Sequence, residues 1–133
     1  MNLLTKTLRG TTAVLAVLVV LQPILAGGFL SGHYDLLRMH RLTGFSLFAV
    51  ALAQAVVVVF LVRRGGSRSL LGPGLMLPAL VAAQAALGIF RILALHIPFG
   101  VMMVIGITHM ARNVWRPPAA DDVPVAAKAE VPA

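Results

Sequence analysis

Two histidines, His40 and His96, are the residues in this chain whose types and spacing best suit chemistry. Each stands near the start of an apolar stretch and is followed four residues later by a glycine, Gly44 in one case and Gly100 in the other. An imidazole nitrogen is a strong axial ligand for iron, and a porphyrin between two helices needs one such ligand from each side. A glycine four residues on falls on the same helix face and lets a flat macrocycle approach the backbone. The pattern therefore predicts a haem b site with both histidines as metal ligands.

Further polar residues accompany the two histidines. A glutamine precedes each of them, Gln22 in the first copy and Gln84 in the second, and each glutamine is followed by leucine three residues later. The chain thus contains a short internal repeat. Arg41 lies next to the first histidine, where its guanidinium is suited to pairing with a haem propionate. The expected cofactor-binding residues are His40, His96, Gly44, Gly100, Arg41, Gln22 and Gln84.

A purely structural role explains the same residues. Near a membrane interface an imidazole reaches water or headgroups at little cost, and glycines in membrane helices commonly allow close packing. The glutamines are then hydrogen-bond partners between helices, and the arginines extend to the interface. Of the other histidines, His33 falls in a loop, and His109 lies 13 positions after His96, about 20 Å deeper along one helix. Both interpretations stay open.

The composition is that of an integral membrane protein. Of the 133 residues, 59% are hydrophobic and 11% are charged, which leaves too little polar surface for a soluble domain. The net charge is +7, but the basic residues flank apolar runs and form no patch with interleaved aromatics, so nucleic acid is not an expected partner. The absence of cysteine excludes covalent attachment of a c-type haem, so any haem is held non-covalently.

The sequence offers few residues for acid–base catalysis within the predicted spans. All four carboxylates fall in predicted loops or in the tail: Asp35, Asp121, Asp122 and Glu130. The sequence patterns of serine hydrolases, zinc proteases and P-loop nucleotide-binding proteins do not occur. No catalytic residue is therefore assigned, and enzymatic activity stays undecided.

The hydropathy pattern predicts four membrane spans, at about 11–30, 40–62, 70–91 and 95–115, within one domain covering residues 1–116. Residues 117–133 are rich in Ala, Pro and Val without periodicity and predict a disordered tail. A cleaved signal peptide is the alternative for the first span. We favour a retained helix because its glutamine matches the one in the third span. The expected fold is an all-α, four-helix transmembrane bundle of two parallel-repeated helical hairpins.

The basic residues predict the orientation of these spans. One side of the membrane receives Lys6, Arg9, Arg63, Arg64, Arg68, Arg112, Arg116 and Lys128, and the other receives Arg38, Arg41 and Arg91. The positive-inside rule therefore puts both termini, and the tail, in the cytoplasm of a cell whose inner or plasma membrane holds the protein. The two histidines then lie at similar depth near the outer face, and the hairpins run in the same direction.

The chain resembles one four-helix half of the haem A synthase family in three places. Residues 37–44 (Leu-Arg-Met-His-Arg-Leu-Thr-Gly) open the second span, residues 84–88 form a Gln-x-x-Leu-Gly segment in the third, and a histidine opens the fourth. More loosely, the chain is similar to membrane b-type cytochromes of the cytochrome b561 kind. In the haem A synthase pattern the second and fourth helices of a half each supply a haem ligand, which implies His40 and His96.

The chain also departs from that family. The family pattern has a glutamate shortly before the second-helix histidine, where residues 35–39 here read Asp-Leu-Leu-Arg-Met. The family also has eight helices and two haem sites. Synthesis of haem A by this chain alone is therefore not expected.

The function that the sequence favours is a small b-type haem-binding protein in electron transfer, with haem between the second and fourth helices near the outer face. Its expected partners are the lipid bilayer and either a quinone or a redox protein, and a homo-oligomer is a further candidate state. The competing hypothesis is a non-catalytic membrane subunit or interaction protein that binds no cofactor. In that case the repeat exists for helix packing.

Overall fold

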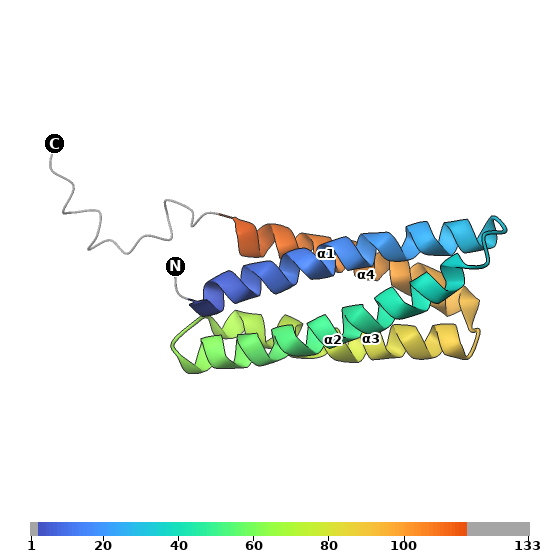
Figure 1. Ribbon diagram of the computed structural model, residues 1–133. Helices are drawn as coiled ribbons and strands as arrows, with labels where there is room; N and C mark the ends of the chain where they lie inside the picture. Colours follow the sequence, from blue (N-terminus) through green and yellow to red (C-terminus); the bar gives the residue numbers. More distant parts are fainter. Residues whose placement is uncertain (1–2, 117–133) are drawn as a thin grey trace, which may run out of the picture.

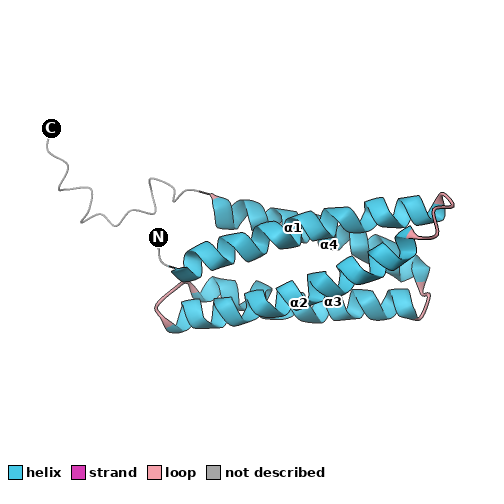
Figure 2. Ribbon diagram, viewed as in Figure 1, coloured by secondary structure: helices cyan, strands magenta, loops and turns pink. Residues whose placement is uncertain are grey.

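Four long α-helices make up the part of the chain that the computed structural model describes, residues 3–116 (Figures 1 and 2). They are α1 (Leu3–Leu30), α2 (Leu36–Arg63), α3 (Leu71–Ile89) and α4 (Leu93–Trp115), and a short 3-10 helix, η1 (Arg68–Leu70), precedes α3. Within these residues no strand occurs. All four helices are long and apolar enough to cross a bilayer. The prediction of an all-α, multi-pass membrane protein with a four-helix bundle is confirmed.

The helices do not begin and end where the hydropathy pattern placed the spans. α1 begins at Leu3, well before the predicted span of 11–30, whereas α3 ends at Ile89, slightly short of the predicted 70–91. An apolar window locates the bilayer core, but backbone hydrogen bonds continue a helix through polar flanking residues until a turn ends it. The predicted tail, 117–133, lies outside the described residues.

The helices form two hairpins that run in the same direction (Figure 1). α1 packs against both α2 and α4, and α2 also packs against α3, while the contact between α3 and α4 is the sparsest of the four. In residues 3–116, α2 and α4 have no close backbone approach and face each other diagonally across the bundle. One end of the bundle carries the α1–α2 and α3–α4 turns. We call it the histidine end, and the opposite end, where α1 begins and α4 finishes, the terminal end.

The core lies in the middle of the bundle and draws on all four helices. Its buried apolar side chains are Leu15, Val19, Leu47, Ala51, Leu77, Val81, Met103 and Ile107. In contrast, α4 has no buried residue before Met103, so its first two turns contribute no fully buried side chain to the core. Large apolar side chains such as Val17, Phe45 and Ile97 point away from the core and are exposed in the isolated chain. A lipid bilayer is the environment in which such a surface is stable.

A buried polar contact joins three helices near the terminal end. Gln54 of α2 is 1% exposed, and its Oε1 lies 3.1 Å from the hydroxyl of Thr12 on α1. Its Nε2 donates to Sδ of Met110 on α4, 3.6 Å away. At the same end, Nε of Arg9 donates to the Val114 carbonyl at 3.2 Å. These contacts tie the first helix to the last.

Three of the helices end in the same kind of turn. After α1, α2 and α3 the chain takes a left-handed backbone conformation at Gly32 (φ 101°), Gly65 (φ 91°) and Arg91 (φ 57°). In the last case the amide of Ile92 donates to the Leu87 carbonyl, which is the hydrogen bond of a Schellman motif. Glycine accepts this conformation without steric cost, whereas arginine does not.

Candidate functional site

The two histidines singled out by the sequence meet inside the bundle. His40 lies in the second turn of α2 and His96 in the first turn of α4, both half-buried at the histidine end. Their ring centroids are 6.2 Å apart and the ring planes are inclined at 70°. Because α2 and α4 are diagonal neighbours, the two rings approach each other across the interior of the bundle and not along one helix pair.

Each imidazole is held by the main chain of its own hairpin. Nδ1 of His40 lies 3.2 Å from the carbonyl oxygen of Gln22, and Nδ1 of His96 lies 2.9 Å from that of Gln84. A carbonyl can only accept, so Nδ1 must carry the proton in both rings. In a neutral imidazole the other nitrogen, Nε2, then keeps its lone pair. Metal-binding histidines commonly have this arrangement, in which a hydrogen bond from the other ring nitrogen fixes the tautomer and the orientation of the ring.

The spacing of the rings matches what one shared metal ion requires. A metal–imidazole bond is about 2 Å long and the bonded nitrogen lies about 1 Å from the centre of its ring, so two rings on opposite sides of one iron have centres about 6 Å apart. The observed 6.2 Å is close to that separation, and it is also an ordinary spacing for two rings in edge-to-face contact. Residues 3–116 contain no group of three or more His, Cys, Asp or Glu side chains suited to a metal ion. The histidine pair can supply two nitrogen ligands, which is the number that haem iron takes from a protein with two axial histidines.

The glutamine side chains make contacts different from those of their carbonyls. Nε2 of Gln22 donates to the hydroxyl of Thr43 at 2.7 Å, and Nε2 of Gln84 donates to the main-chain carbonyl of His96 at 2.8 Å. Oε1 of Gln84 is buried without a hydrogen-bond partner. Both amides therefore bridge the helices of one hairpin, as the packing interpretation expects.

Gly44 and Gly100 lie against these same glutamines. A Cβ built on Gly100 would be 2.7 Å from Nε2 of Gln84, and one built on Gly44 would be 3.7 Å from Oε1 of Gln22. The Gln84 amide thus occupies the space beside Gly100, whereas a Cβ on Gly44 would make an ordinary van der Waals contact with Gln22. The macrocycle contact expected for these glycines is a separate role, and only a bound haem can test it.

The remaining candidates lie on the surface. Arg41 is exposed at the histidine end, and within residues 3–116 its side chain has no hydrogen bond or ion pair, so its guanidinium is free to meet an anionic group. His33 is exposed in the α1–α2 turn, and His109 is exposed near the opposite end of α4. Neither joins the histidine pair.

Sequence reasoning missed the part that the main chain plays. The carbonyls that hold the imidazoles carry no side-chain signature, and neither Thr43 nor Gly88 was among the expected site residues. Gly88 lies in contact with the His96 ring. The signal that pointed to it was the Gln-x-x-Leu-Gly spacing, which sets it one helical turn after Gln84.

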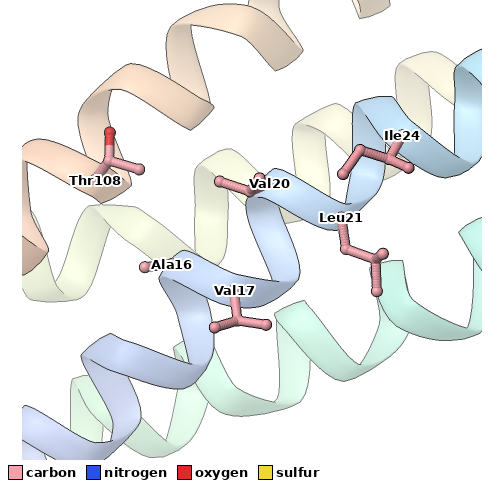
Figure 3. Close-up of a pocket in the computed structure, with 6 residues that line it drawn as sticks. All are labelled: Ala16, Val17, Val20, Leu21, Ile24 and Thr108. Atoms are coloured by element: carbon pink, nitrogen blue, oxygen red, sulfur yellow. The ribbon is translucent and has the colours of Figure 1, made fainter.

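A hollow on the surface lies away from the histidine pair (Figure 3). Five of the residues that line it come from α1 and one from α4, and all are apolar except Thr108. The hollow contains none of the candidate site residues, and in a bilayer acyl chains cover such a surface.

Comparison with known proteins adds no family assignment. No protein-family model matches the chain, and no match to a curated protein or to a solved structure is found.

Proposed function

We propose that this protein is a small b-type haem-binding membrane protein in electron transfer, with Nε2 of His40 and Nε2 of His96 as the axial ligands. The observation that carries the proposal is the paired geometry of the two rings. Both have Nδ1 hydrogen-bonded to a main-chain carbonyl, and their centres are 6.2 Å apart. The sequence resemblance to half of a haem A synthase supports the same two ligands.

The residues of the chain have distinct tasks in this proposal. The two imidazoles would bind iron, and the carbonyls of Gln22 and Gln84 would accept from Nδ1–H and so fix the orientation of both rings. Arg41 pairs with a propionate at the membrane surface. Haem supplies a one-electron change between ferric and ferrous iron when bound. Two imidazole ligands would suit electron exchange with a quinone or a redox protein better than oxygen chemistry.

The distribution of basic residues supports the placement of the site. Arg63, Arg64 and Arg68 lie in or near the α2–α3 connection at the terminal end, while the histidine end carries fewer basic residues. We infer that the terminal end, with both termini, faces the cytoplasm of a cell bounded by this inner or plasma membrane. The histidine pair then lies near the outer face. A homo-oligomer is compatible with the exposed apolar surface of α4.

A second candidate function rests on the glutamine amides. They bridge α1 to α2 and α3 to α4, so the Gln and His residues also form hydrogen bonds that stabilise each hairpin in the membrane. In this alternative the protein is a non-catalytic subunit and the histidines bind no cofactor.

The experiment that decides is an absorption spectrum of the purified protein in detergent, expressed with ample haem and measured oxidised and then reduced with dithionite. We expect a reduced α-band in the wild type, its loss in the His40→Ala/His96→Ala double variant, and its retention in His109→Ala, a matched exposed histidine on α4. A colourless wild type, or a band that survives in the double variant, overturns the haem proposal. A colourless wild type leaves the packing account in its place.

A further inference from the structure

The His96 ring lies directly on the backbone of Gly88. A Cβ built on this glycine would be 2.9 Å from Cε1, 3.2 Å from Nδ1 and 3.5 Å from Nε2 of the imidazole. The first of these distances is shorter than any stable carbon–carbon contact, since nonbonded carbon atoms prefer about 3.5–4.0 Å. A side chain at this position and the present ring position therefore exclude each other.

The backbone conformation of Gly88 does not explain the choice of glycine. The residue is helical, in the last turn of α3, and its φ is not positive. Glycine inside a helix is destabilising relative to alanine. The close approach of the His96 ring is the feature that requires it.

The first hairpin has a side chain at the corresponding position. Gly88 follows Gln84 by four residues, and the residue four after Gln22 is Ala26. The hydrogen bond between the imidazole and the glutamine carbonyl is 2.9 Å long where glycine stands and 3.2 Å long in the hairpin with alanine. Whether the residue at this position affects the length of the bond is tested with an Ala26→Gly variant.

We propose that Gly88 is the positioning residue that fixes the plane and the Nδ1 hydrogen bond of His96. Its effect on a bound haem rests on the function proposed above, but its effect on the imidazole does not. An alanine at this position forces the ring to turn or withdraw, which lengthens or breaks the bond to the Gln84 carbonyl. The Nδ1 proton then loses its acceptor, and Nε2 loses its fixed direction.

The first experiment uses haem-free protein and ¹⁵N NMR of the histidine side chains in detergent. We expect wild-type His96 to show a protonated Nδ1 and a bare Nε2, and Gly88→Ala to mix the two tautomers. Gly27→Ala is the matched control, because Gly27 lies near the same end and a Cβ there meets nothing within 4 Å. An unchanged His96 spectrum in a folded Gly88→Ala protein overturns the inference.

Two further measurements separate this inference from the haem proposal. In haem-loaded protein we expect Gly88→Ala, but not Gly27→Ala, to shift the largest g value of the ferric EPR spectrum and the midpoint potential, since both depend on the orientation of the axial imidazoles. If the wild type binds haem and Gly88→Ala shifts neither quantity, the proposed role of Gly88 is overturned and the proposed function is unaffected. If the wild type binds no haem, the NMR comparison still decides.

A reverse variant covers the case in which Gly88→Ala does not fold. Ala26→Gly removes the side chain at the corresponding position of the first hairpin. We expect the His40 Nδ1–H resonance to move toward that of His96 as its hydrogen bond shortens. No movement contradicts the proposal that this position controls the imidazole.

Discussion

The two hairpins reach the same imidazole contact by different local means. In α1–α2 the histidine follows its glutamine by 18 residues and in α3–α4 by 12, yet in both a glutamine carbonyl accepts from Nδ1. The first turn spans residues 31–35 and the second only 90–92. The shared feature is therefore the geometry of the imidazole and not the length or sequence of the connection.

The supporting residues of the two hairpins differ. Thr43, three residues after His40, accepts from the Gln22 amide, whereas Phe99 stands three residues after His96 and offers no acceptor. The Gln84 amide instead donates to the main-chain carbonyl of His96, and its Oε1 has no hydrogen-bond partner. The second hairpin thus holds its imidazole more closely but satisfies its glutamine less completely.

The largest expected effect comes from removing the imidazole of either hairpin. We expect His40→Gly and His96→Gly each to lose the low-spin, six-coordinate spectrum of the haem-loaded protein, because one axial ligand disappears. Free imidazole in the buffer should restore it by entering the vacated space. Optical titration measures this, and recovery in neither variant would argue against direct ligation.

The second prediction concerns the paired glycines. Gly100→Ala should destabilise the protein by about 1–3 kcal/mol, because the new methyl group meets Nε2 of Gln84 at 2.7 Å. Gly44→Ala, with 3.7 Å to the Gln22 side chain, should be neutral or gain up to about 1 kcal/mol of helix stability. Thermal unfolding in detergent distinguishes them. Equal effects of the two substitutions would contradict the difference between the hairpins.

The left-handed turns provide the third prediction. Arg91→Gly should raise stability by about 1 kcal/mol, since a non-glycine residue at positive φ is strained by that order. Gly32→Ala, at φ 101°, should lower it by a similar amount. Both changes are read as shifts in melting temperature, and a destabilising Arg91→Gly would show that the arginine side chain does more than occupy the turn.

The smallest expected effect separates the two glutamines. Gln22→Met removes a satisfied hydrogen bond and should cost about 0.5–1 kcal/mol. Gln84→Met removes one hydrogen bond but also a buried acceptor without a partner, so its net effect should be close to zero. Denaturant unfolding in mixed micelles measures the difference. A larger loss for Gln84 than for Gln22 would refute the unequal satisfaction of the two amides.

The sequence predicted the architecture better than the contacts. Long apolar runs and basic flanks identify four spans, because crossing a bilayer demands them, and the repeat around His40 and His96 pointed to the pair that meets in the structure. The helix ends were less predictable because backbone hydrogen bonding continues past the apolar window. The Gln22 and Gln84 carbonyls were not predictable, since every residue has a carbonyl and only the fold selects which one faces an imidazole. Gly88 was visible in the repeat, but its contact depends on the ring position.

The contacts between α1 and α4 also bear on the order in which the protein assembles in the membrane. Helices enter the bilayer as they are synthesised, so the α1–α2 hairpin can form its Gln22–His40 contact while the second half is still being made. Of the four described helices, α4 is synthesised last, and it packs against α1 through contacts that include the Arg9–Val114 hydrogen bond. His96 joins the pair only at that step. The two-histidine site therefore exists only after α4 has been inserted, which makes a completed site a marker of the assembled four-helix bundle.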